Sequence, residues 1–231
     1  YLNNHNNTFY CLLEILNTFF CDNLFNNVIE IDYNNSDKKS NLEDCFNYFY
    51  DKSLFNYDNL NSVFQNKDDL FNLNNFIKLS NNNRNLYDLS IINVNKIFFN
   101  DINYDLNEIL LLYVILSLNV VKTNGNSILS LDLNKITKNV YLEILFFLSC
   151  IFKSITLCKP KCSILDERKI YIICKEKNNF AKEELINISI PVFQNIIEKP
   201  KNKYTYSFLK FDIPLFYKNK LNETLINFER Y

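Results

Sequence analysis

Apolar positions along the chain switch between a helical and a strand period, which predicts alternating helices and strands. Residues 9–20 place apolar side chains on a broad helical face, whereas residues 27–33 alternate and predict a short strand ending in Asp32. The same patterns predict further strands at 86–92 and 126–133 and further helices at 104–121 and 138–152.

The polar, Asn-rich segment 34–82 carries only scattered apolar positions, which predicts short helices and loops. The most apolar run, residues 109–121, is too short to span a bilayer and predicts a buried helix. Gly125, the only glycine of the chain, follows this helix and suits the left-handed position just beyond a helix end.

Residues 154–159 and 170–175 are two apolar runs around a polar loop, and they predict an antiparallel hairpin. Lys159-Pro160 is expected to end the first of these strands, because proline cannot donate a hydrogen bond within a ladder.

Strands that alternate with helices imply parallel strands that are joined by right-handed crossovers and covered on both faces. We therefore predict an α/β fold with a Rossmann-like, mostly parallel sheet, an antiparallel final hairpin and helices on both faces. An unrelated doubly wound α/β protein with an antiparallel edge is the alternative.

We expect one domain over residues 1–231, with the sheet core in 1–180 and a C-terminal helical extension in 181–231. The helical clusters 182–188 and 218–228 of this extension are expected to pack on the outside.

The composition adds three expectations. A net charge of −1 provides no global basic field of the kind that attracts nucleic acid or anionic membranes. The 21 phenylalanines and 15 tyrosines favour a folded core despite the abundance of asparagine. Because the sequence contains no methionine, Tyr1 is not an initiator, and we expect the chain to be a segment of a longer protein.

Seven scattered cysteines, an odd number, are typical of reduced thiols in a nuclear or cytoplasmic protein. Cys158 and Cys162 lie close together, but no second pair and no nearby histidine completes a zinc site, so we expect no metal. His5 is the only histidine, which argues against His-dependent acid–base catalysis; it is either a solvated loop residue or a remnant of a cofactor-binding turn.

The segment 139–177 contains an aromatic-rich helix, a strand that ends in Lys159-Pro160, a loop with Ser163 and Arg168, and the strand Tyr171-Ile172-Ile173-Cys174-Lys175. This segment resembles the closing helix and hairpin of the FtsJ/RrmJ-like RNA 2′-O-methyltransferases. It is most similar to the cap-specific branch, which forms cap 1 on messenger RNA. Further segments resemble the family in the same order, namely 41–50, 86–93, 109–125 and 190–228.

The resemblance implies an enzyme that uses S-adenosylmethionine, binds it over the carboxyl ends of the strands and methylates a ribose 2′-hydroxyl of capped RNA. In this family a glycine-rich turn after the first strand lets the backbone approach the cofactor. A Lys-Asp-Lys-Glu arrangement supplies a lysine base of lowered pKa, because the ribose hydroxyl is a poor nucleophile.

On the same resemblance, the cofactor turn falls on residues 5–9, which contain no glycine. The cofactor-binding positions that follow from it are Asn6, Asn7 and Thr8, together with Asp32 and Asn93. An asparagine tolerates the left-handed conformation, but its side chain occupies space that the cofactor needs.

The catalytic positions are also substituted. Asn93 stands where the family has its Asp, and the central Lys falls within Ser130–Asp132, at Leu131. Lys169 stands where the family has its Glu, although Glu167 would restore the acid if the register slipped by two residues. The first Lys would precede residue 1. These departures together lead us to expect impaired catalysis and weak or absent S-adenosylmethionine binding.

Two functions of different classes follow from the resemblance. One is an active RNA 2′-O-methyltransferase with substituted residues; the other, which we favour, is an impaired domain kept as an RNA-binding or structural module of a larger protein or complex. Capped messenger RNA is the expected partner, and no membrane is expected. Two lysine groups are either RNA contacts or ordinary solvated surface: Lys153, Lys159 and Lys161; and Lys199, Lys201 and Lys203 with Tyr204 and Tyr206.

Overall fold

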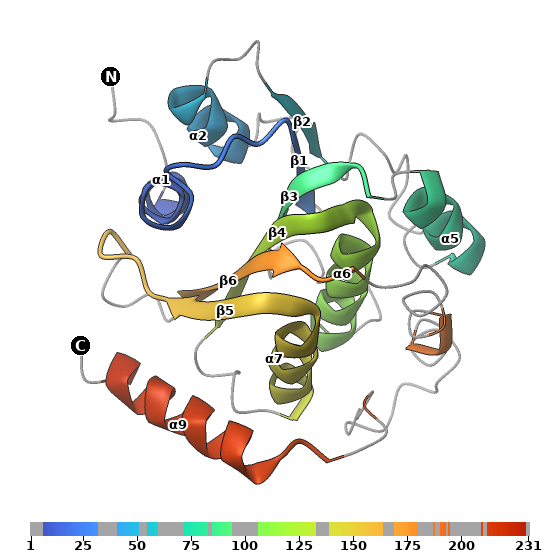
Figure 1. Ribbon diagram of the computed structural model, residues 1–231, viewed down its shortest axis with the longest axis vertical. Coiled ribbons are helices and arrows are strands. Elements are labelled where there is room, and N and C mark those ends of the chain that lie inside the picture. The colour runs from blue at the N-terminus through green and yellow to red at the C-terminus, as the bar shows by residue number, and fades with distance from the viewer. Residues whose placement is uncertain are drawn as a thin grey trace.

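In the computed structural model, helices lie on both sides of a six-stranded sheet (Figure 1). The strands are β1 (Asn27–Ile31), β2 (Asn56–Asn59), β3 (Tyr87–Ile92), β4 (Val121–Asp132), β5 (Phe152–Cys158) and β6 (Lys169–Lys177). The helices are α1 (Asn7–Phe19), α2 (Asn41–Phe49), α5 (Leu73–Asn82), α6 (Leu106–Val120), α7 (Asn139–Ile151) and α9 (Leu215–Glu229). The structure describes residues 7–31, 41–50, 55–59, 72–82, 85–93, 106–132, 139–163, 169–179, 187, 190–192, 194, 209 and 212–229.

The strand order is β2-β1-β3-β4-β6-β5. The first four strands in this order run parallel, whereas β6 lies antiparallel between β4 and β5. Ile155 pairs with Cys174 and Leu157 pairs with Ile172, so the two predicted segments do form an antiparallel hairpin. Lys159 and Pro160 follow β5 directly. These pairings confirm the predicted fold class, including its antiparallel final hairpin.

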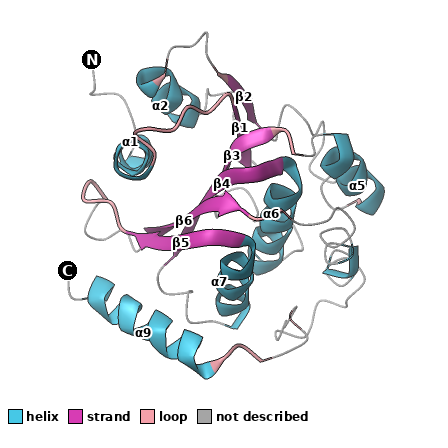
Figure 2. Cartoon of the chain, viewed as in Figure 1, coloured by secondary structure: helices cyan, strands magenta, loops and turns pink. Residues whose placement is uncertain are grey.

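Helices cover the two faces of the sheet separately, as the cyan helices on either side of the magenta strands show (Figure 2). On one face, α1 and α2 pack through a buried cluster that includes Leu12, Phe46 and Ile128. On the other face, α6 and α7 pack through a second cluster, to which Leu221 and Leu225 of α9 also belong. The sheet is therefore the middle of three layers, as its apolar strands require.

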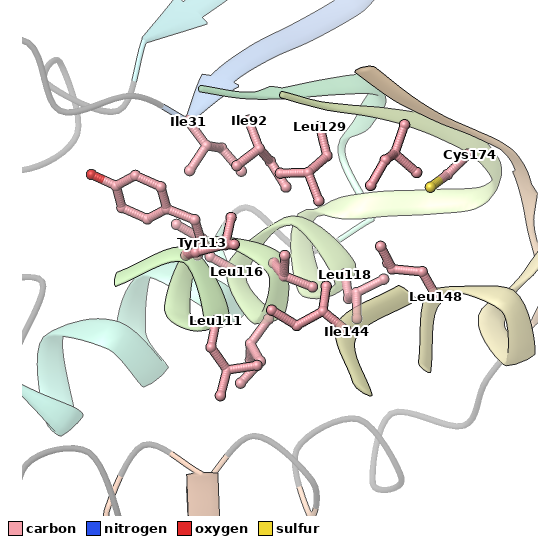
Figure 3. Packing of buried hydrophobic residues seen from close by; sticks show 14 of the residues in the cluster. Ile31, Ile92, Leu111, Tyr113, Leu116, Leu118, Leu129, Ile144, Leu148 and Cys174 are labelled. Carbon is pink, nitrogen blue, oxygen red and sulfur yellow. The ribbon is translucent and has the colours of Figure 1, made fainter. Parts of the chain in front are cut away.

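The core on the α6 side is built from neighbouring strands that face one helix (Figure 3). Ile31, Ile92 and Leu129 project from β1, β3 and β4 toward α6, and all three are buried. Every side chain from Ile109 to Leu118 is buried as well, as expected for a helix that is apolar on all sides. Among the helices that the structure describes, none combines the length and the apolar character needed to cross a membrane.

The position of Gly125 corrects a prediction. It does not follow a helix end, because α6 runs directly into β4 and Gly125 lies inside that strand without a positive φ. β4 bulges against β3 at this point, and the left-handed conformation in the bulge belongs to Asn124, with φ 60°. A Cβ on Gly125 would lie 2.6 Å from Cγ1 of Val121 and 2.8 Å from the carbonyl oxygen of Lys122. The glycine therefore allows a close approach of the chain to itself.

The edge strand β2 is a second correction, because the polar segment that contains it predicted only short helices and loops. Its residues pair with β1 through the backbone, and two tyrosine hydroxyls add cross-strand hydrogen bonds. Tyr57 donates to Glu30 at 2.5 Å, and Tyr87 donates to Asp58 at 2.8 Å. Helices α2 and α5 agree with the prediction for this segment. Most of the predicted helical cluster 182–188 lies outside the described residues.

Candidate functional site

The candidate site lies where the carboxyl ends of the parallel strands meet, because that edge is where sheets of this type bind ligands. Asn93 directly follows β3, and its backbone N–H donates to the carbonyl oxygen of Ile31, the last residue of β1, at 3.3 Å. β6 begins at the same edge, since its first residue, Lys169, pairs with the last residue of β4, Asp132. Three strands thus deliver polar side chains to one place.

A hydrogen-bonded cluster forms around the side chain of Asn93. Its Oδ1 accepts a hydrogen bond from Ser130 Oγ at 2.8 Å and another from Lys169 Nζ at 3.2 Å. Asn93 and Ser130 are each 7% exposed. Buried polar groups need such partners, so the two donors fix the Asn93 amide in place. We call Asn93, Ser130 and Lys169 the edge cluster.

Tyr171 packs against the edge cluster. It pairs with Ser130 across β4 and β6, and its buried ring lies 5.6 Å from Lys169 Nζ, measured to the ring centroid. This distance is in the range of a cation–π contact, which orients the lysine over the ring. Lys169 is therefore held between an aromatic face and an amide oxygen.

A small, partly open hollow adjoins the edge cluster. Asn93, Ser130 and Tyr171 line it from the sheet, and Thr8 and Leu12 of α1 line it from the opposite side. Its enclosed space is about 10 Å³, roughly what a single water molecule needs. As the described residues shape it, the hollow is too small for a whole nucleoside cofactor.

The structure brings together three of the residues that the sequence singled out. Thr8, Asn93 and Lys169 all lie around the hollow or the edge cluster. Asn7 is the first residue of α1, and its Oδ1 accepts a weak hydrogen bond from Cys11 Sγ at 4.0 Å. Because α1 precedes β1, Asn7 and Thr8 follow no strand within the described part of the chain. Asn6, Asp32 and Glu167 lie outside that part.

Leu131 lies away from the edge cluster. It is 5% exposed and belongs to the hydrophobic cluster on the α6 side of the sheet. Alternate residues of a strand point to opposite faces, so Ser130, and not Leu131, faces the α1 side with Asn93. Within the predicted range Ser130–Asp132, Ser130 is thus the residue that contacts Asn93.

Glu30 is a further buried polar residue near the site that was not predicted from the sequence. This carboxylate lies inside β1, is 4% exposed and accepts the hydrogen bond from Tyr57. Val28, two residues earlier on the same face, packs in the α1 and α2 cluster, so Glu30 points to the face that carries the hollow. A charged residue within an otherwise apolar strand is the signal that identifies it.

Chemically, the edge cluster offers donors and one amide oxygen. A lysine accepts a proton from an alcohol only in its neutral form, and neither a serine hydroxyl nor an amide oxygen is a strong base. Among the described residues, no group of three or more His, Cys, Asp or Glu side chains is arranged to hold a metal ion.

No protein-family model matches the sequence, and neither does any curated protein. Solved structures that resemble the chain include an O-methyltransferase family protein from Burkholderia thailandensis, with TM-score 0.38 and 9% identity over 73% of this chain and 56% of that one. A fibrillarin pre-rRNA processing protein from Methanococcus jannaschii has TM-score 0.36 and 6% identity, over 68% of each chain.

A third similar structure is phosphoethanolamine N-methyltransferase 2 from Haemonchus contortus, in complex with phosphomonomethylethanolamine and S-adenosylhomocysteine. It has TM-score 0.37 and 13% identity, over 80% of this chain and 42% of that one. The chain thus spans 56% and 42% of the length of two of these proteins. Because all three TM-scores are below 0.5, our description of the fold and the site rests on the strand order and contacts of this chain.

Proposed function

We propose that this chain is an RNA 2′-O-methyltransferase-like domain of the cap-specific type whose methyl transfer is impaired and which acts by holding RNA. The sheet with its antiparallel closing hairpin supports the methyltransferase-like part of the proposal. The impairment rests on the edge cluster, which is the single observation that carries the proposal.

At the edge cluster, an amide stands where the resemblance implies a carboxylate. Asn93 Oδ1 is occupied by the donors of Ser130 and Lys169, at 2.8 and 3.2 Å. Ser130 lies where a lysine base would have to reach this cluster, and Leu131 is buried in the core. General-base assistance is worth ~10²–10⁴ in rate, so its loss alone would nearly silence transfer to a ribose hydroxyl.

S-adenosylmethionine is the cofactor that the proposal implies, and we expect it to bind weakly or not at all. The Asn93 amide oxygen beside the hollow is already occupied by Ser130 and Lys169. The enclosed space of about 10 Å³ has room for roughly one water molecule and not for the nucleoside part of the cofactor.

The test combines calorimetry with transfer of a radiolabelled methyl group to short capped RNA. For the 231-residue chain we expect no label on RNA above background and no cofactor binding tighter than ~10 μM, which corresponds to ~7 kcal/mol. We also expect capped RNA to bind. Label transfer by the unmodified chain would overturn the impairment, and absence of RNA binding would overturn the RNA-holding role.

The RNA contacts that we propose are Lys159 and Lys161, which follow β5 at the carboxyl edge. Lys153 lies at the other end of β5 and is paired with Glu176 at 2.8 Å, so it serves as the matched control. With these two phosphate contacts, binding to single-stranded RNA should weaken ~7-fold between 50 and 200 mM salt. Replacing Lys159 and Lys161 by Gln should reduce this salt dependence, whereas Lys153→Gln should leave it unchanged.

A second candidate function is an active methyltransferase that uses Lys169 as its base. The observation that favours it is the contact of Lys169 Nζ with Asn93 at the site edge. If label transfer occurs, Lys169→Met should abolish it under this alternative, while Lys153→Met should not. The two functions thus predict opposite results in one assay.

We also propose that the chain works in a nuclear or cytoplasmic, reducing compartment beside other domains or subunits of a larger protein or complex. The odd number and the wide spacing of its seven cysteines support the assignment to a reducing compartment.

A further inference from the structure

Helix α1 is latched to the loop that connects β5 to β6. The Glu14 carboxylate accepts hydrogen bonds from the backbone N–H groups of Lys161 at 2.8 Å and Cys162 at 3.1 Å. Burial acts to raise the pKa of Glu14, but these two backbone hydrogen bonds outweigh it and lower the pKa below its usual range. The latch therefore holds an ionised carboxylate at neutral pH.

One helical turn before Glu14 on the same helix, Cys11 faces the same loop. Its Sγ lies 3.7 Å from Sγ of Cys162, although the two cysteines are 151 residues apart in the sequence. Cys11 is 1% exposed, whereas Cys162 is exposed to solvent. To form a disulfide, the two side chains would have to rotate until the distance between their Sγ atoms falls from 3.7 Å to the ~2.05 Å of an S–S bond.

A third thiol, that of Cys158, lies near the same two residues. Burial first, and then Glu14 and Cys11, raise the pKa of Cys158 to about 11. Cys158 is therefore the alternative partner that the test below has to distinguish.

We propose that low-molecular-weight disulfides such as oxidised glutathione oxidise Cys11 and Cys162 to a reversible disulfide bond between the two residues. This bond covalently locks the β5–β6 loop onto α1. The exposed Cys162 thiolate attacks one glutathione sulfur, forming a mixed disulfide and releasing one glutathione thiolate, which takes up a proton. The thiol of Cys11 loses its proton and attacks the Cys162 sulfur, which releases the second glutathione. Two protein thiols are oxidised and one glutathione disulfide is reduced to two thiols.

The disulfide would act on both sides of the site. α1 carries Thr8 and Leu12 into the hollow, and the loop begins with Lys159 and Lys161, the RNA contacts of the proposed function. This consequence for RNA rests on the proposed function, whereas the disulfide itself does not. Partial burial, then the Glu14 hydrogen bond and the nearby Cys11 raise the pKa of Cys162, which lowers its thiolate fraction at neutral pH, so we expect the exchange to be slow there.

The test oxidises the full chain with excess oxidised glutathione at pH 8.5 and maps the linkage by mass spectrometry. Cleavage after Lys, Arg and Glu separates Cys11 (residues 1–14) from Cys21 (residues 15–30), and Cys162 (residues 162–167) from Cys158 (residues 154–161). We expect a linked 1–14/162–167 peptide that disappears with dithiothreitol, and a rise in Tm of about 5–15 °C on oxidation.

Two variants separate the proposed bond from other oxidation. Cys162→Ser should abolish both the linked peptide and the rise in Tm, whereas replacing the exposed Cys21 by Ser should leave both unchanged. A link to Cys158, a disulfide between two chains, or glutathione left on Cys162 as the end product would each overturn the proposal. Because linkage is read on the unmodified chain, it holds or fails independently of RNA binding and of methyl transfer.

Discussion

Two lysines of β6 bind the carboxyl ends of helices on opposite faces of the sheet. Lys175 Nζ donates to the carbonyl oxygen of Phe19 at the end of α1. Lys177 Nζ donates to two carbonyl oxygens where α6 passes into β4, those of Leu118 and Val121, each at 2.5 Å. Alternate residues of a regular strand share a face, but Glu176 between the two has φ 56°. This local distortion turns Lys177 to the other face, where its charge complements the helix end.

Lys177→Met should destabilise the chain by about 2 kcal/mol, because it leaves two buried carbonyl groups without their charged donor. The loss is partly offset, since burial of an ammonium group is itself costly. Lys175 is only half-buried, so the Phe19 carbonyl can be hydrated and Lys175→Met should cost less than about 1 kcal/mol. Urea unfolding of the two variants measures the difference. Equal losses of unfolding free energy in the two variants would mean that the burial of Lys177 does not strengthen the contribution of its hydrogen bonds.

The sequence predicted which residues lie near the site better than it predicted the face of the sheet to which their side chains point. The family resemblance singled out Asn93 and Lys169, and the structure joins them by a hydrogen bond. Leu131 was singled out by the same reasoning and faces the core, one position from Ser130. A shift of one residue reverses the face of a strand side chain, and in a strand that is apolar on both faces the pattern cannot define that register.

At the scale of elements, α1 is held to the closing hairpin by the Glu14 latch. A carboxyl group whose pKa is lowered by folding stabilises the folded state above its unfolded pKa of ~4.3, and this stabilisation disappears as the pH falls through the folded pKa. Glu14→Gln should therefore lower Tm by about 1–3 °C at pH 7, because a neutral amide accepts the two N–H groups less strongly.

The same difference in Tm should shrink as the pH falls below the unfolded pKa of ~4.3, and it should vanish once the pH is below the folded pKa of Glu14. Thermal unfolding of both proteins at several pH values from 7 down into the acid range checks this, with Glu176→Gln as a control for an exposed ion pair. A difference that did not shrink at all as the pH fell would show that the Glu14 contact does not depend on its charge.

Elements with a strong apolar period were predictable, whereas elements defined by backbone pairing were not. α6 and the β5–β6 hairpin follow from their sequence patterns to within a few residues. β2 has the sequence Asn-Tyr-Asp-Asn, whose apolar content gives no strand period; it exists because the exposed edge of β1 offers backbone partners. The early start of β4 was hidden because its first residues form a bulge that only Gly125 can accommodate.

For the whole molecule, the order of elements along the chain was sufficient to predict the fold class, although not the edge strand β2. Parallel strands with right-handed crossovers leave few ways to arrange the predicted elements, and the closing hairpin fixes which strand lies at the edge. Function does not follow in the same way, because a fold of this type supports many activities and the site decides among them. The edge cluster is therefore the part of the molecule in which substitution is most informative.

Restoring the expected charges at the edge tests fold and function together. Asn93→Asp combined with Ser130→Lys places both groups on the face of the hollow, and this double variant should stay folded. Asn93→Asp combined with Leu131→Lys buries an ammonium group in the α6 cluster, and it should lose about 3 kcal/mol or more in urea unfolding. Neither should transfer a methyl group to capped RNA, because neither pair of substitutions enlarges the hollow beside Asn93. Turnover by the first variant alone would show that the cofactor site is intact and that the impairment lies only in the missing base.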